Sequence, residues 1–160
     1  MPNDTHPYFR HHPADDMPGF STWDLKEPGL YNDLLGPLYV RRLDTGIAQM
    51  RMVPQRQHSN LDNAVHGGTL LGFIDIALFA GAHQYGVDIA GRSSTIELQT
   101  QFIGAGLIGQ PLDCDVEVLR ETGRLVFLRG TVHQNDGSHL VASFSGILRK
   151  SSSAKAIAPK

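Results

Sequence analysis

One acidic residue stands inside the most apolar stretch of the chain. Asp75 lies among leucine, isoleucine and phenylalanine residues between Leu70 and Phe79. An ionised carboxylate is costly to bury among such side chains unless hydrogen bonds or a function compensate. A carboxylate in this position can act as a general base on water or as a nucleophile. The structural alternative is that Asp75 lies at a wet contact between subunits and binds another group there.

A second chemical feature precedes it in the chain, at His66, Gly67 and Gly68. Two glycines let the backbone approach a ligand closely, and the free N–H groups at the start of a helix carry the positive end of its dipole. Such an N–H can hold the oxyanion that develops during acyl transfer. The same three residues could instead form only a junction between loop and helix.

The spacing of the two features has a geometric consequence. Asp75 follows Gly67 by eight residues, which is about 12 Å along a helix at 1.5 Å per residue. That distance is too long for both residues to act on one carbonyl within a single chain. A two-fold axis could bring Gly67 of one subunit to Asp75 of another, so the spacing predicts a site shared across a dimer interface.

One long helix is expected to carry both features. Residues 64–86 have no polar face before His83 and Gln84, and a helix that is apolar all round is a buried helix. Gly86 can end this helix. Residues 38–44 and 47–53 predict a β-hairpin around a Thr-Gly turn. From Ser94 onward the apolar period changes to two, and turns at 122–123 and 135–137 predict a four-strand antiparallel meander.

This order of elements favours an α+β fold in which one curved antiparallel sheet wraps around one long central helix. We expect a second copy of the chain to cover an open face or edge of that sheet. The predicted domain spans residues 23–150. Residues 1–22 are rich in His, Pro and Asp without an apolar period, which predicts a flexible arm, and residues 151–160 predict a flexible tail.

Composition excludes several classes of partner. The formal net charge of -2 does not indicate a nucleic-acid groove or binding to an anionic membrane surface. No signal peptide is recognisable, and the apolar stretch 69–82 is shorter than the roughly 20 residues that span a bilayer. We therefore expect a cytoplasmic protein with no nucleic-acid and no membrane partner. The histidines of the arm lack the spacing of metal ligands, so no metal is expected.

The single cysteine, Cys114, has Asp113 and Asp115 as its neighbours. Adjacent negative charge disfavours a thiolate, and one cysteine builds no disulfide framework. Cys114 is therefore interpreted as a small residue of a strand rather than as a nucleophile.

The pattern N-x-x-x-x-x-H-G-G from Asn60 to Gly68, with an acid nine residues after the histidine, resembles a known family. It is similar to the 4-hydroxybenzoyl-CoA thioesterase and PaaI-like (phenylacetic acid degradation) branch of hotdog thioesterases, over roughly residues 35–149. The resemblance implies a hotdog fold and an acyl-CoA thioesterase that hydrolyses an aryl- or medium-chain acyl-CoA to the free acid and CoA. It also implies a homodimer or homotetramer. CoA is part of the substrate, and no separate cofactor is implied.

The resemblance assigns roles to individual positions. Asp75 corresponds to the family's catalytic Asp or Glu, and Gly67 to the glycine whose backbone N–H polarises the thioester carbonyl. Asn60 corresponds to a position that helps to hold the substrate or the attacking water. His66 and Gly68 are expected beside the substrate, with His66 fixing the entry to the helix rather than transferring protons.

Thr95 lies near a Ser or Thr position of the family that assists the carboxylate or the water. That match needs a short insertion in the preceding loop, so Ser93 or Ser94 could take its place. The family also has a glycine shortly before HGG, where this chain has Asn63-Ala64-Val65. Because Asn tolerates left-handed backbone angles, the turn can survive, and the departure bears on substrate preference more than on reaction type.

Two other functions fit the same fold. One is a non-catalytic acyl-CoA-binding protein, although a pure binder gains nothing from a buried acid beside the thioester. The other is a hotdog hydratase or dehydratase, which would pair His66 with Asp75. The HGG context matches thioesterases better than hydratases.

Overall fold

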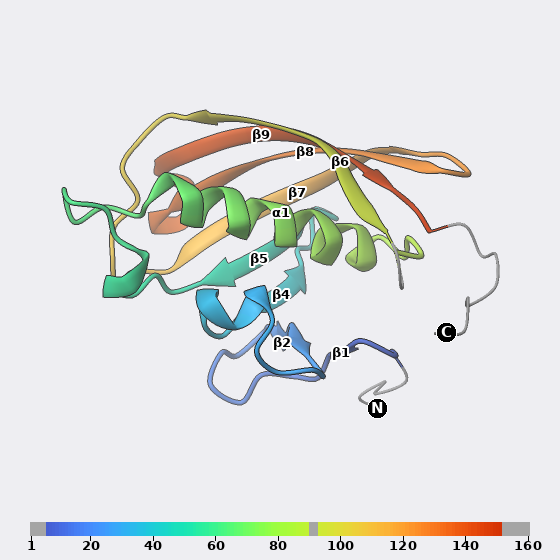
Figure 1. Ribbon diagram of the computed structural model, residues 1–160, viewed down its shortest axis with the longest axis horizontal. Coiled ribbons are helices and arrows are strands. Elements are labelled where there is room, and N and C mark those ends of the chain that lie inside the picture. Colours follow the sequence, from blue (N-terminus) through green and yellow to red (C-terminus); the bar gives the residue numbers. More distant parts are fainter. Residues whose placement is uncertain (1–5, 90–92, 152–160) are drawn as a thin grey trace, which may run out of the picture.

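The computed structural model describes residues 6–89 and 93–151 of the chain. Within these residues the large antiparallel sheet has seven strands, and the helix α1 (Gly67–Gln84) has 18 residues. Figure 1 shows the sheet curving around this helix. The predicted α+β architecture is therefore confirmed. The other elements are β1 (Phe9–Arg10), β2 (Ser21–Thr22), β3 (Asp24–Leu25), η1 (Tyr31–Leu35), β4 (Tyr39–Arg42), β5 (Ala48–Met52), η2 (Arg56–His58), β6 (Ser94–Phe102), β7 (Leu112–Glu121), β8 (Leu125–Gln134), η3 (Asn135–Gly137) and β9 (His139–Arg149), where η marks a 3₁₀-helix.

The strands of the large sheet follow the order β2-β4-β5-β7-β8-β9-β6, and β1 pairs with β3 in a small separate sheet. The predicted hairpin is present as β4 and β5, with Gly46 at a φ of 87° in the turn between them. The turn predicted at residues 135–137 is also present. It lies between β8 and β9, and positive φ values occur at Asn135, Asp136 and Gly137.

The predicted four-strand meander is wrong for its first strand. β6 pairs with β9, whereas β7 pairs with β5 and β8. Residues 103–111 carry the chain from β6 across to β7, and Figure 1 shows β6 beside β9. The side chain of Gln134 holds this connection through hydrogen bonds to both backbone groups of Leu107. Alternation identifies a strand, but only a tight turn identifies its neighbour, and this connection has none.

The helix is buried because its apolar residues meet the sheet on several sides. Phe73, Ile74 and Leu78 have no exposed surface, and burying such a side chain contributes about 1.5–3 kcal/mol. α1 approaches β7 so closely that a Cβ at Gly81 would lie 2.6 Å from Cγ1 of Val116. None of the helices in the described ranges is both long enough and apolar enough to cross a membrane.

Cys114 lies on β7 and faces this core with no exposed surface. Burial raises the pKa of its thiol well above the ordinary value, and the charges of Asp115 and Asp113 add to the effect. The interpretation of Cys114 as a small strand residue is confirmed.

The N-terminal segment packs against the domain. Composition predicts a flexible arm over residues 1–22, but the structure buries Phe9 and Phe20 of this segment. The Phe20 ring contacts the guanidinium groups of Arg41 and Arg51, whose carbons lie 4.3 and 4.7 Å from its centroid. The apolar side chains of the N-terminal segment are too widely spaced to form a period, so the sequence pattern does not reveal their packing. The predicted tail falls almost entirely outside the described residues, which end at Ser151.

Candidate active site

The loop before α1 is held by a buried histidine. His58 is only 3% exposed, and its Nδ1 accepts a hydrogen bond from the Gln55 N–H at 2.8 Å. Because Nδ1 accepts, Nε2 carries the ring hydrogen and donates to the Leu34 carbonyl at 2.7 Å. The His58 carbonyl also accepts from the His66 N–H at 2.8 Å. His58 thereby connects η1, η2 and the start of α1 through its side chain and its backbone carbonyl, and the sequence pattern did not single it out.

Asn60 closes the turn that leads into the helix. Its Oδ1 accepts hydrogen bonds from the backbone N–H groups of Asp62 and Ala64, at 2.9 and 3.0 Å. Asn63 adopts a φ of 58°, so the prediction that asparagine sustains a left-handed turn here is confirmed. Among the described residues, the Nδ2 amide of Asn60 has no hydrogen-bond partner. Asn60 is therefore a loop residue whose only free polar group is a donor.

The start of α1 leaves one backbone donor free. His66 is the N-cap residue, and its Nδ1 accepts from the Gly68 N–H at 2.9 Å. The Gly67 N–H has no hydrogen-bond partner within the described part of the chain. The ring of Phe102 lies beside it, because a Cβ at Gly67 would be 3.5 Å from Cζ of Phe102. A free N–H at a helix N-terminus, next to an exposed aromatic ring, is suited to a negatively charged oxygen.

Asp75 lies half-buried in the middle of α1, between fully or nearly fully buried neighbours. Its Oδ1 accepts a hydrogen bond from Thr95 Oγ1 at 2.6 Å, and no described residue binds its Oδ2. The structure thus places Thr95 against the carboxylate. Ser93 accepts a hydrogen bond from the Ser151 N–H instead, and the buried Oγ of Ser94 has no partner among the described residues. One carboxylate oxygen is oriented and the other is available to a water or a carbonyl carbon.

A single chain does not bring all of these groups together. Thr95 contacts Asp75 in the middle of α1. Gly67 and Gly68 lie in the first turn of the helix, next to the N-cap residue His66, and Gly67 is about 12 Å from Asp75 by helix rise. Within one chain the carboxylate of Asp75 and the free N–H of Gly67 are therefore separate groups.

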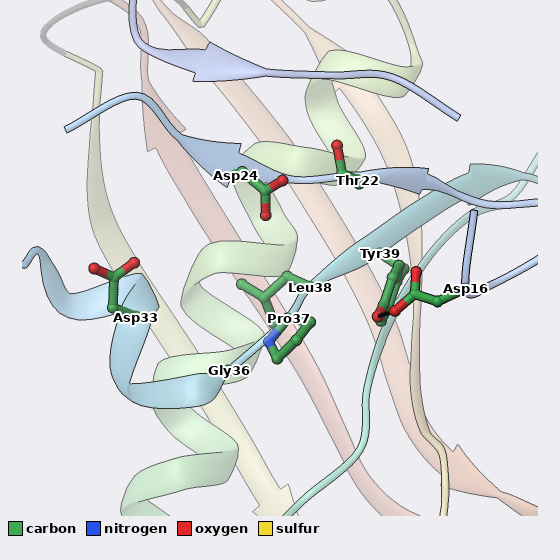
Figure 2. A pocket seen from close by; sticks show the side chains of 8 residues that line it. All are labelled: Asp16, Thr22, Asp24, Asp33, Gly36, Pro37, Leu38 and Tyr39. Carbon is green, nitrogen blue, oxygen red and sulfur yellow. Dashed lines mark hydrogen bonds between the residues drawn. The ribbon is translucent and has the colours of Figure 1, made fainter. Parts of the chain in front are cut away.

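Two cavities lie elsewhere on the molecule. The cavity in Figure 2 has a volume of about 460 Å³ and lies between the N-terminal segment and the start of β4. Asp16, Asp24 and Asp33 line it together with Tyr39. Tyr39 donates a hydrogen bond to Asp16 at 2.6 Å, and burial together with this bond raises the pKa of Tyr39 to about 12. These acids do not contact Asp75.

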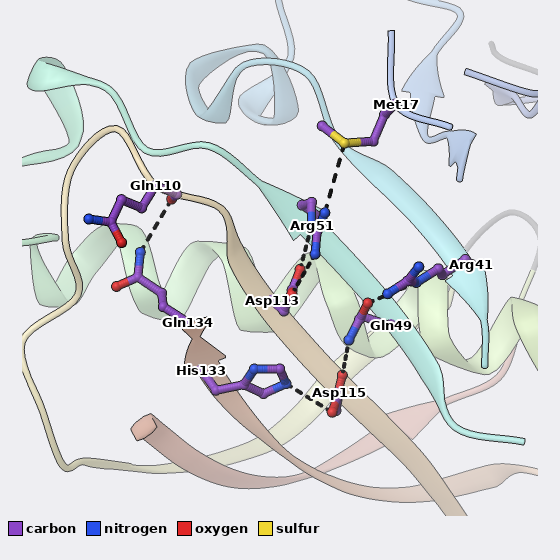
Figure 3. Close-up of polar contacts among 9 residues, drawn as sticks. All are labelled: Met17, Arg41, Gln49, Arg51, Gln110, Asp113, Asp115, His133 and Gln134. Atoms are coloured by element: carbon purple, nitrogen blue, oxygen red, sulfur yellow. Dashed lines mark hydrogen bonds and ion pairs between the residues drawn. The ribbon is translucent and has the colours of Figure 1, made fainter. Parts of the chain in front are cut away.

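The second cavity, of about 410 Å³, lies on the face of the sheet that points away from α1. Figure 3 shows the polar network along it, in which Arg51 binds Asp113 through two hydrogen bonds of 2.7 and 2.8 Å. Asp115 accepts from Gln49 at 2.8 Å and pairs with His133 at 2.9 Å. Alternation along the strands predicts only that these side chains point away from the core.

The charges in this network shift each other's ionisation. The hydrogen bond with Asp115 raises the pKa of His133, against the opposing effect of burial. Burial alone would raise the pKa of Asp115, but the hydrogen bonds from His133 and Gln49 outweigh it, and the pKa is lowered. The network lies on the outer face of the sheet and is separate from Asp75 and Gly67 on α1.

Comparison with known proteins gives a match to the region that contains α1 and β6. Residues 62–140 match the model of the thioesterase superfamily. No curated protein matches the sequence. Among solved structures, the PaaI protein from the phenylacetic acid degradation operon of Escherichia coli is similar, with 21% identity and a TM-score of 0.62 over 74% of this chain and 86% of that one.

Two further structures extend this likeness. A conserved protein from Pseudomonas aeruginosa has 26% identity and a TM-score of 0.65, over 77% of this chain and 94% of that one. A hypothetical thioesterase from Streptococcus pneumoniae, solved with coenzyme A, has 13% identity and a TM-score of 0.64, over 75% of this chain and 90% of that one. The predicted hotdog fold is confirmed.

Proposed function

We propose that this hotdog-fold thioester hydrolase of the thioesterase superfamily cleaves acyl-CoA thioesters with Asp75 as its catalytic carboxylate. The observation that carries the proposal is the contact between Thr95 Oγ1 and Asp75 Oδ1 at 2.6 Å. That contact holds a carboxylate within an apolar helix and leaves its second oxygen free. The free N–H of Gly67 supplies the complementary group, a donor for an oxyanion.

Asp75 supports hydrolysis in either of two ways. As a general base, Oδ2 takes a proton from a water whose oxygen bonds to the thioester carbon; the C–S bond then breaks, and the CoA sulfur receives the proton. As a nucleophile, Oδ2 bonds to the thioester carbon and expels the CoA thiolate, and water then hydrolyses the acyl-carboxylate anhydride. In both routes the carbonyl oxygen becomes negative. Loss of one preorganised donor for such an oxygen typically slows catalysis by about 10²–10³-fold.

The other predicted site residues fit around these two groups. The Nδ2 amide of Asn60 is free to donate to the substrate or to water, since Oδ1 is occupied by the loop. His66 is exposed and can contact the substrate through Nε2, while Nδ1 caps the helix. Gly68 contributes by its small size only, because its N–H is bound to His66. Arylacyl and medium-chain acyl groups are the proposed substrates.

The separation of Gly67 from Asp75 supports a homodimer, or a homotetramer of such dimers, with each active site built from two subunits. In this arrangement the donor of one subunit faces the carboxylate of its partner. The solved structure of the Streptococcus pneumoniae relative contains coenzyme A, which supports CoA as the carrier of the acyl group here.

Free-thiol release from a panel of aryl- and straight-chain acyl-CoAs tests the proposal. Asp75→Asn keeps the shape of the side chain and removes its basic and nucleophilic oxygen, so kcat is expected to fall about 10²–10⁴-fold. Asp62→Asn changes an exposed acid of the preceding loop and is the matched control. Wild-type rates in Asp75→Asn would refute the assignment. Acyl-CoA binding without thiol release would favour a binding protein, and hydration of an unsaturated acyl-CoA would favour a hydratase.

Subunit mixing tests the shared site with the same assay. Gly67→Pro removes the N–H and adds a ring whose Cβ lies 3.5 Å from Cζ of Phe102, an ordinary van der Waals contact. The backbone is compatible with the change, because proline is favoured at the first helical position and His66 already has the extended backbone that precedes proline (φ −62°, ψ 139°). Asp75→Asn and Gly67→Pro are each expected to be inactive. Dimers mixed from the two at equal amounts should regain roughly a quarter of wild-type activity, because half are heterodimers with one intact site. No recovery after verified exchange would place both groups in one subunit's site.

A further inference from the structure

The short helix η1 lies directly on the exposed side of α1. Its first residue, Tyr31, contacts the helix backbone at Gly72. A Cβ at Gly72 would overlap the Tyr31 hydroxyl and lie 2.9 Å from both Cζ and Cε1 of the ring. The absence of a side chain at Gly72 is therefore what allows the ring to lie there.

This contact is close to the carboxylate. Gly72 precedes Asp75 by three residues, which is about 4.5 Å along the helix axis and about 60° around it. Tyr31 is 51% exposed, and Leu71 beside Gly72 is 39% exposed. The Tyr31 side chain therefore lies within about one helical turn of Asp75, on an exposed part of the α1 surface rather than in the core.

The helix η1 that carries Tyr31 is held at both of its ends. Leu35 is 3% exposed and belongs to the core, and the Leu34 carbonyl accepts the 2.7 Å hydrogen bond from His58. At the other end, the Gly29 N–H donates to Asp33 at 2.6 Å. Figure 2 shows Asp33 on η1 with α1 behind it. These contacts hold the backbone of η1 in place, and the half-exposed Tyr31 side chain rests on Gly72 from there.

We propose that Tyr31 is a specificity-determining residue that forms one wall of the acyl-binding space beside Asp75 and limits the size of the acyl group. The inference rests on the proposed function, because it describes a wall of that same site. An acyl chain whose thioester carbon is at Asp75 meets the ring if it extends along α1 toward Gly72. Removal of the ring opens that direction, and each additional methylene that becomes buried there is worth about fourfold in kcat/KM.

Three variants separate the ring from the rest of Tyr31. Tyr31→Ala removes the ring, whereas Tyr31→Phe keeps it. Gly72→Ala leaves Tyr31 intact but places a Cβ where the ring lies, so the ring must swing outward. Because alanine favours the helix by about 1 kcal/mol over glycine and the displaced side chain is half-exposed, Gly72→Ala is expected to fold. Leu34→Ala, at a 64% exposed position of η1, is the matched control.

The experiment measures kcat/KM by thiol release for straight-chain acyl-CoAs from butyryl to palmitoyl and for benzoyl-CoA. Tyr31→Ala and Gly72→Ala are both expected to raise the ratio of long-chain to short-chain kcat/KM by about tenfold or more, which corresponds to two or more newly buried methylenes. Tyr31→Phe and Leu34→Ala are expected to keep the wild-type order of preference.

Titration calorimetry with the same acyl-CoAs gives the order of affinities without turnover. If Tyr31→Ala and Gly72→Ala remain active and keep the wild-type ratio, the inference about Tyr31 is overturned and the proposed function stands. If the wild type releases no thiol, the proposed function fails. In that case the calorimetric affinities test the inference about Tyr31. An unchanged order of acyl-CoA affinities in Tyr31→Ala and Gly72→Ala overturns it as well.

Discussion

Replacing Thr95 with valine removes the hydrogen bond to Asp75 Oδ1 and keeps a β-branched side chain of nearly the same shape. At 2.6 Å this is a short bond from a hydroxyl to a carboxylate, the type that contributes about 1.5–3 kcal/mol. Both side chains are half-exposed, so water competes for the carboxylate and the lower end of that range applies. Since 1.36 kcal/mol changes a rate tenfold, kcat/KM of Thr95→Val is expected to fall about 10-fold.

The assay is thiol release from the best acyl-CoA substrate, together with thermal unfolding to show that each variant is folded. Thr95→Ser retains the hydroxyl and is expected to stay within about threefold of the wild type. Ser94→Ala is the neighbouring control, because the buried Oγ of Ser94 has no hydrogen-bond partner and its loss should leave kcat/KM unchanged. Wild-type kcat/KM in Thr95→Val, or an equal loss in Ser94→Ala, would refute the role of this hydrogen bond in orienting Asp75.

Two further predictions concern stability. The pKa of His133 is raised above 6.5 and that of Asp115 lowered below 3.8, so the charged pair stabilises the fold between these values and its contribution is lost as the pH rises through the pKa of His133. Urea unfolding of His133→Gln should therefore show a larger loss of stability near pH 5.5 than near pH 8.5, and equal losses would contradict this. Gly81→Ala places a Cβ 2.6 Å from Val116 Cγ1 and is expected to destabilise by about 1–3 kcal/mol, seen as a lower Tm; a Tm at or above that of the wild type would show that the contact relaxes freely.

The features that local patterns predicted are those that depend on neighbours in the chain. The apolar run of residues 64–86 predicted α1, and the acid within it predicted a half-buried carboxylate. The left-handed turn at Asn63 was expected from the family's glycine before HGG together with the residue type of asparagine. The resemblance predicted Thr95, with Ser93 or Ser94 as alternatives, near Asp75, and in the structure Thr95 Oγ1 donates to Asp75 Oδ1.

The features that sequence reasoning missed depend on contacts between distant segments. Alternation predicted β6 as a strand, but its pairing with β9 depends on a crossover that carries no turn signal. The ring of Tyr31 lies on Gly72 because η1 is held by His58, and neither contact leaves a mark in a periodic pattern. Gly72 was the one sequence signal for the Tyr31 contact, because an isolated glycine inside a helix often marks the close approach of another segment.

The burial of Cys114 determines how thiol chemistry reports on this protein. The chain has a single cysteine, and in the folded state its sulfur is out of contact with water and its pKa is raised. A chromogenic disulfide reagent added during turnover therefore reads the CoA that is released and not the enzyme itself. The same sulfur becomes accessible only when β7 separates from α1, so the rate at which it is alkylated in the absence of substrate measures the opening of the core.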